Sequence, residues 1–316
     1  MTHPDGLCYN KLMARFSLLP FDQILDGIQE TRAWYEESLG IPTAGTRLEL
    51  IHAKTAELIR DLNSSLIRED IVERWSNFDT YYAISDGAGF GKICREIRQI
   101  GPNLLPKKTL RAILHGPLSP TDENPSDGSV NARNLFAELE LAADLSEKGI
   151  KPSGFDDLQF DFDGVPFAVQ CKRLMSPRSV ANNIQRAYEQ LQRNLVTDHH
   201  RGLIALTAER VLNLDGRILR VEKEEDLLSE VHRLIEEFRT RFGHPWWNFV
   251  DTRVVGLIIV LRFLCYTVRH NVIGPAYYVS FINLASPECL QASELKRLQA
   301  LTSYLQRAAT AGTIPL

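Results

Sequence analysis

Residues 155–173 read FDDLQFDFDGVPFAVQCKR, and this stretch decides the fold of the C-terminal part of the chain. Polar and apolar residues alternate on both sides of Asp163-Gly164, a dipeptide suited to a two-residue type I′ turn. The pattern predicts two antiparallel strands across residues 157–172. With that turn, the large apolar side chains gather on one face of the hairpin: Leu158, Phe160, Phe162, Val165, Phe167 and Val169.

The other face of this hairpin carries residues that can perform chemistry. Counting outward from the turn places Asp157 opposite Gln170, and Lys172 lies two residues further along on the same face. Directly opposite side chains in an antiparallel pair have Cβ atoms about 5 Å apart, so Asp157 and the Gln170 amide oxygen can bind one cation. Asp156 would point the other way.

The segment before the hairpin has helical periodicity over residues 131–148. Glu138 shares a face with apolar residues, whereas Glu140 falls on the far side. A carboxylate within an apolar face is costly unless a partner compensates it, which makes Glu138 a candidate ligand. Each candidate also has an ordinary structural explanation, such as an ion pair or a cross-strand hydrogen bond. A structural polar cluster therefore stays open as the alternative to an active site.

Several short motifs resemble the PD-(D/E)XK nucleases. The order is that of an acid helix, a catalytic hairpin, and the helix and strand that continue this core: ELELAADLSEKG (138–149), DDLQFDFDG (156–164), VQCKR (169–173), AYEQLQRNL (187–195) and RGLIALTAERVL (201–212). The Gln-x-Lys form of VQCKR is similar to the Mrr-type restriction endonucleases. The resemblance covers about residues 131–210, and it implies a restriction-endonuclease-like α/β fold with a mixed sheet flanked by helices.

The same resemblance implies metal-dependent hydrolysis of DNA phosphodiester bonds, with a role in restriction or defence against foreign DNA. Mg²⁺ or Mn²⁺ would be held by Asp157, the side-chain oxygen of Gln170 and a backbone carbonyl near Cys171. Glu138 would bind directly or through water, and Lys172 would position and help to deprotonate the attacking water. Gln170 departs from the commoner acid, and a neutral amide binds a hard cation less strongly than a carboxylate.

Basic residues outnumber acids after the hairpin, which fits a groove along a nucleic-acid backbone, although solvated helix surfaces explain some of them equally well. The candidates for nucleic-acid binding are Arg173, Arg178, Arg186, Gln190 and Arg193. RNA is not excluded as the substrate, and cutting both strands of a duplex would favour a homodimer. The alternative is a catalytically inactive nucleic-acid-binding or scaffolding protein that retains the nuclease fold.

Residues 117–129, PLSPTDENPSDGS, are rich in Pro, Ser and Asp and are interpreted as a linker. They would join an all-helical N-terminal domain (1–116), which would choose substrates or bind a protein partner, to the nuclease-like domain (130–316). In the first domain helices are expected near 21–39, 47–62, 66–82 and 90–114. In the second, helices are expected at 131–148, 179–196, 224–241 and 291–309, and further strands at 202–208, 253–261 and 276–283.

The stretch DGAGFGK (86–92) has one residue too few for a phosphate-binding loop of the form G-x-x-x-x-G-K. It is interpreted as a flexible loop between two helices.

Composition and charge bound the remaining possibilities. The chain is 44% hydrophobic and 24% charged, as expected of a globular protein. A net charge of -4 excludes a uniformly basic nucleic-acid binder, but a nuclease needs only a local basic cleft. The N-terminus lacks the basic start and apolar stretch of a secretory signal, and the apolar run Val254–Leu261 is far shorter than the roughly 20 residues of a membrane span. We therefore expect a cytoplasmic protein without a membrane partner.

Overall fold

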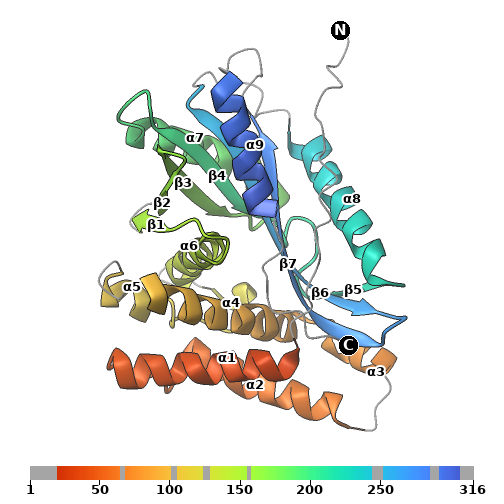
Figure 1. The fold of residues 1–316 in the computed structure, drawn as a ribbon. Coiled ribbons are helices and arrows are strands. Elements are labelled where there is room, and N and C mark those ends of the chain that lie inside the picture. The colour runs from red at the N-terminus through yellow and green to blue at the C-terminus, as the bar shows by residue number, and fades with distance from the viewer. Residues whose placement is uncertain are drawn as a thin grey trace.

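The computed structural model describes residues 20–64, 68–100, 105–123, 129–154, 158–243, 252–284 and 292–306. The N-terminal part is helical, with α1 (Phe21–Ala33), a π-helical turn η1 (Trp34–Ser38), α2 (Arg47–Leu62), α3 (Arg68–Trp75), α4 (Phe78–Ile100) and α5 (Lys107–Ala112). Figure 1 shows α1, α2 and α4 as a layer beneath the rest of the chain, with α6 (Ser129–Glu147) between that layer and a sheet.

The remaining elements alternate helices and strands. In chain order they are the 3₁₀ turn η3 (Pro120–Asp122) and α6, then β1 (Pro152–Gly154), β2 (Leu158–Phe162), β3 (Val165–Arg173), η4 (Pro177–Ser179), α7 (Val180–Asn194), β4 (Arg201–Thr207), β5 (Ile218–Val221), α8 (Glu224–Phe242), β6 (Val254–Thr267), β7 (Val272–Asn283) and α9 (Ala292–Gln306). The predicted helices and strands of this part are present with shifted ends, and two short strands, β1 and β5, had no sequence signal.

The strands form one mixed sheet in the order β1-β2-β3-β4-β6-β5, with β7 paired to β6. Strands β3, β4, β6 and β5 run parallel to one another. The antiparallel pairs are β1 with β2, β2 with β3, and β7 with β6. One face packs against α7 and α8, and the other against α6 and α9. A mixed α/β fold with helices on both faces of the sheet and a helical N-terminal region is therefore confirmed.

The hairpin has the register that the sequence predicts. Asp163 and Gly164 both have positive φ, at 53° and 71°, as a type I′ turn requires. Phe160 pairs with Phe167, and their rings stack with centroids 5.2 Å apart. Leu158, the first described residue of β2, pairs with Val169. The apolar face of the hairpin is buried beneath α6, which completes this part of the core.

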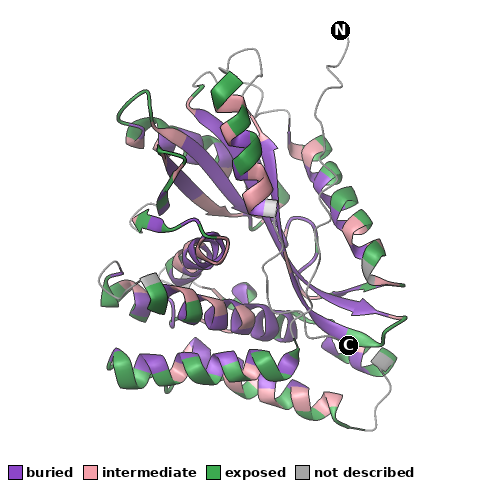
Figure 2. Cartoon of the chain, in the orientation of Figure 1, coloured by how far each residue is buried: buried purple, intermediate pink, exposed green. Residues whose placement is uncertain are grey.

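The N-terminal helices share a hydrophobic core with the rest of the chain. Phe136 and Leu139 of α6 and Leu264 and Tyr266 of β6 belong to the same buried cluster as residues of α1, α2 and α4. Figure 2 shows that buried positions dominate α6 and the central strands, while α1 keeps an exposed outer side. Residues 117–123 of the predicted linker therefore connect two parts that are packed together.

The flexible loop predicted at Asp86–Gly91 is wrong, because α4 runs through it without a break. A Cβ on Gly91 would lie 3.3 Å from the Cα of Gly27 in α1, and a Cβ on Gly89 would lie 2.8 Å from the Phe136 ring in α6. The glycines thus permit close packing of α4 against helices on both sides. This packing outweighs the low helix propensity of glycine.

Strand β6 also continues beyond its predicted end at Leu261. Arg262 lies within it, is 5% exposed, and is paired with acidic residues from other elements. Since its charge is compensated inside the protein, it does not end the strand.

Gly89→Ala distinguishes the packed helix from a flexible loop. In a helix with free space, Ala would stabilise by up to about 1 kcal/mol, but the clash with Phe136 should destabilise the protein by about 1–3 kcal/mol. Denaturant unfolding measures the change, with Gln99→Ala at an exposed position of the same helix as the control. A variant as stable as the wild type contradicts the close packing.

Candidate functional site

Two of the four predicted catalytic residues lie on the same face of β3. Ala168 and Leu174, which alternate with Gln170 and Lys172 along the chain, pack into the hydrophobic cluster beneath α7. Gln170 and Lys172 therefore project towards α7 as well. Gln170 is 5% exposed, and the Nζ of Lys172 donates a hydrogen bond of 2.6 Å to Oε1 of Gln190 in α7. Lys172 is thus held in one place by the neighbouring helix.

Glu138 approaches from the opposite side of the sheet. It is half-buried on α6, whose apolar residues, including Leu141 and Leu145, pack on the α6 face of the sheet. Asp157, the residue expected to join it to Gln170 and Lys172, lies outside the described residues. Gln170 and Lys172 thus share one face of the sheet, Glu138 comes from the helix on the other face, and the convergence of all four residues stays a prediction.

Three of the four proposed metal ligands lie in the described part of the chain. Gln170 supplies an amide oxygen, Cys171 a backbone carbonyl and Glu138 a carboxylate. Within the described residues, no group of three or more His, Cys, Asp and Glu is arranged to hold a metal ion. These donors alone do not form a site for a hard divalent cation, which favours carboxylates. The fit to Mg²⁺ or Mn²⁺ requires Asp157.

The predicted nucleic-acid-binding residues divide into two groups. Arg178, Arg186 and Arg193 are exposed on η4 and α7. Gln190 follows Arg186 by four residues and precedes Arg193 by three, so the three share one side of α7, and Gln190 touches Lys172.

Arg173 differs, because its guanidinium is paired with Glu123 at 3.2 Å and its side chain is 9% exposed. A direct contact of Arg173 with substrate would require that pair to open.

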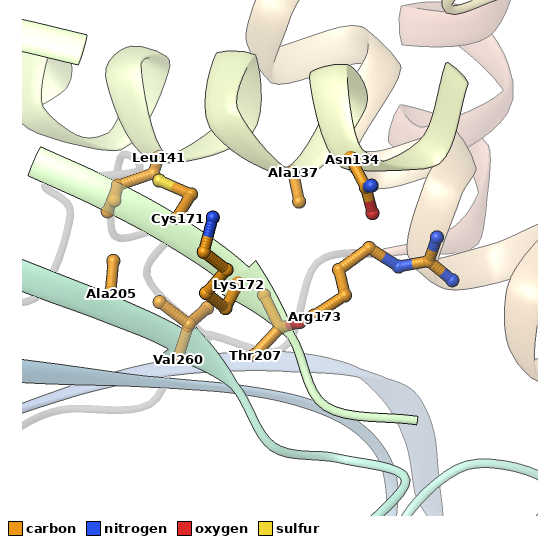
Figure 3. Close-up of a pocket in the computed structure, with 9 residues that line it drawn as sticks. All are labelled: Asn134, Ala137, Leu141, Cys171, Lys172, Arg173, Ala205, Thr207 and Val260. Atoms are coloured by element: carbon orange, nitrogen blue, oxygen red, sulfur yellow. The ribbon is translucent and has the colours of Figure 1, made fainter. Parts of the chain in front are cut away.

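A small hollow lies beside the candidate site, at the carboxyl ends of the parallel strands β3 and β4. It has about 10 Å³ of room, enough for about one water molecule, and about 280 Å³ of empty space when the open solvent at its mouth is included. Its lining combines apolar and polar residues from α6 and three strands: Asn134, Ala137, Leu141, Cys171, Lys172, Arg173, Ala205, Thr207 and Val260. Figure 3 shows Arg173 extending from the end of β3 towards the neighbouring helices. The carboxyl ends of parallel strands are where open α/β sheets bind ligands.

A cluster of buried charged residues joins α4, α6 and the sheet, and sequence reasoning missed it. Asp86 of α4 accepts hydrogen bonds from Arg133 of α6 at 2.7 Å and from Arg262 of β6 at 3.1 Å. Arg262 also pairs with Glu140 at 3.4 Å and with Glu209 at 2.7 Å. We call these five residues the Asp86 cluster. In the sequence, the signal was a charged residue inside an apolar strand.

The electrostatics of this cluster depend on burial and on shared arginines. Burial alone would raise the pKa of Asp86, but Arg133, Arg47 and Arg262 together hold it below its usual value. Burial raises the pKa of Glu140 to about 7, with Arg262 and Lys92 acting against the rise. The sequence placed Glu140 on the side of the helix away from Glu138, and there α4 and Arg262 of β6 bury it.

Comparison with known proteins gives no match, whether to a protein-family model, a curated protein or a solved structure. Within the part of the chain that the structure describes, no helix is long and apolar enough to span a membrane.

Glu140 should make the free energy of unfolding depend on pH. Because its pKa is raised from 4.5 to about 7 on folding, the folded protein holds a proton that the unfolded chain releases. The resulting stability is fully present below pH about 4.5 and is lost as the pH rises towards about 7. Glu140→Gln should remove this loss, which is on the order of 3 kcal/mol.

The free energy of unfolding, measured from pH 4.5 to 8, checks this expectation. Glu57→Gln, at an exposed ion pair with Lys54, is the matched control and should keep the pH dependence of the wild type. If Glu140→Gln and the wild type have parallel pH profiles, Glu140 is not the group responsible.

Proposed function

We propose that this chain is a metal-dependent nuclease of the PD-(D/E)XK type that hydrolyses phosphodiester bonds of DNA. The observation that carries the proposal is the placement of Gln170 and Lys172 on one face of β3, with Lys172 held by Gln190. The helix α6, the hairpin β2–β3, the helix α7 and the strand β4 also follow one another in the order that the motif resemblance implies. The predicted and observed hairpin registers agree.

In this proposal the chain's own residues have distinct tasks. Lys172 positions the attacking water and assists its deprotonation, and Gln190 fixes the Lys172 ammonium by accepting its hydrogen bond at 2.6 Å. Asp157, the side-chain oxygen of Gln170 and the Cys171 carbonyl would hold Mg²⁺ or Mn²⁺, with Glu138 binding directly or through water. When bound, the metal would stabilise the negative charge that develops on the phosphate in the transition state.

The substrate would approach along α7. Arg178, Arg186 and Arg193 are exposed there, so they can contact backbone phosphates without breaking a buried ion pair. A homodimer would place two sites on a duplex for cleavage of both strands. The N-terminal helices would select the substrate or bind a protein partner, in a system for restriction or defence.

Nicking of supercoiled plasmid tests the proposal directly. With Mn²⁺, the wild type should nick DNA, whereas Asp157→Ala and Lys172→Ala should lose at least about 100-fold in rate, as expected for loss of a metal ligand or a proton-transfer group. Removing the metal with EDTA should stop the wild type. Lys54→Ala, at a half-buried position of α2 outside the proposed site, is the control and should retain full activity.

Equal nicking by the wild type and all variants would contradict the proposed site. No nicking by the wild type would favour the alternative, a non-catalytic binding or scaffolding protein. Single-stranded DNA and RNA substrates in the same assay identify the nucleic acid that is cut.

The unusual Gln170 offers a second test. Gln170→Glu supplies the commoner carboxylate, which binds a hard cation more strongly but is costly to bury without one. We expect the variant to be less stable than the wild type without metal and to show the larger rise in melting temperature when Mn²⁺ is added. An equal rise in both proteins places Gln170 away from the metal.

A further inference from the structure

Two arginines converge on one carboxylate at the end of the candidate catalytic strand. Glu123, which directly follows η3, lies 2.6 Å from Nε of Arg133 and 3.2 Å from Nη2 of Arg173. A second contact, Arg173 Nη1 to Glu123 Oε2 at 3.5 Å, makes the Arg173 pair bidentate. The Glu123 and Arg133 side chains are each 3% exposed and that of Arg173 is 9% exposed. We call this arrangement the Glu123 clamp.

The two arginines are held in different ways. Arg133 also donates to Asp86 at 2.7 Å and to the carbonyl oxygens of Pro117 and Leu118 at 2.8 and 2.5 Å. Arg133 therefore keeps several partners if Glu123 moves away. Arg173 has Glu123 as its carboxylate partner in the described part of the chain. Loss of Glu123 would thus leave Arg173 without its carboxylate partner in the described part of the chain, beside an Arg133 that its other contacts hold in place.

The other carboxylate that Arg133 contacts also serves further arginines. Arg133 shares Asp86 with Arg262 and with Arg47, whose Nη1 lies 3.6 Å from Asp86. Glu123 is therefore the carboxylate that Arg133 and Arg173 share, while Asp86 also serves Arg47 and Arg262.

The clamp also lies beside the residues proposed to act on the phosphodiester bond. Arg173 directly follows Lys172, and both line the hollow at the carboxyl ends of β3 and β4 together with the polar Asn134 and Thr207. A nucleic-acid strand that crosses this end of the sheet can contact side chains from both faces of the sheet. A carboxylate and a phosphate accept the same bidentate hydrogen bonds from guanidinium groups.

We propose that Arg133 and Arg173 form a binding site for a phosphate group of the nucleic-acid substrate, and that Glu123 occupies this site until the substrate displaces it. The identity of the substrate rests on the proposed function, but the anion site itself rests on the clamp. Residues 117–123, the described part of the predicted linker, thereby compete with the nucleic acid for Arg173.

Inorganic phosphate tests the site without any cleavage reaction. Glu123→Gln removes the competing charge while keeping the size of the side chain. We expect phosphate to raise the melting temperature of Glu123→Gln clearly more than that of the wild type, relative to chloride at equal ionic strength. By titration, its phosphate dissociation constant should be at least about tenfold lower than that of the wild type. Glu230→Gln, at an exposed pair with Arg233, controls for loss of one carboxylate.

The double variant Glu123→Met with Arg173→Met replaces the pair by apolar side chains of similar length, and it should fold but lose the phosphate response. If Glu123→Gln does not fold, Glu123→Asp, which keeps the charge but shortens its reach, is titrated in its place. The proposal is overturned if the single Glu123 variant responds to phosphate no more than the wild type does. It is also overturned if the response persists in the double variant.

A short oligonucleotide separates a backbone phosphate from free phosphate as the ligand. Tighter binding of the oligonucleotide by Glu123→Gln than by the wild type supports the nucleic-acid assignment, whereas a gain for inorganic phosphate alone limits the site to small anions and overturns that assignment. Because both readouts are binding, they remain informative if the wild type fails to nick DNA.

Discussion

The structure depends on the burial of one guanidinium group, that of Arg262, within a strand that is otherwise apolar. A buried charge is tolerated only when opposite charges and hydrogen bonds surround it, and losing one partner of such a pair costs about 3–5 kcal/mol. The partners of Arg262 come from three separate places: Asp86 of α4, Glu140 of α6 and Glu209 after β4. Buried charges therefore join the N-terminal helices to the sheet, in addition to the hydrophobic core that they share.

The same ion pairs continue to the candidate site. Asp86 pairs with Arg133, Arg133 with Glu123, and Glu123 with Arg173, which adjoins Lys172 on β3. A continuous series of ion pairs therefore joins α4 to the end of β3.

Much of the fold was predictable because the responsible interactions are local. The turn at Asp163-Gly164 sets the hairpin register, and side chains alternate along a strand with period two, so counting placed Gln170 and Lys172 on one face. The glycines of α4 were misread for the opposite reason. A glycine favours a loop by its own propensity, but here Gly89 and Gly91 are required by neighbouring helices that are distant in sequence.

The sequence by itself determined the hairpin, the order of the helices and longer strands after residue 129, and the chemical type of the candidate residues, because these follow from periodicity and turn geometry. Tertiary structure alone decided which charges are buried together. It paired Arg173 with Glu123 and held Lys172 on Gln190. It also made Glu140 a buried partner of Arg262. Such pairings depend on where distant segments meet, and no local pattern in the chain records that.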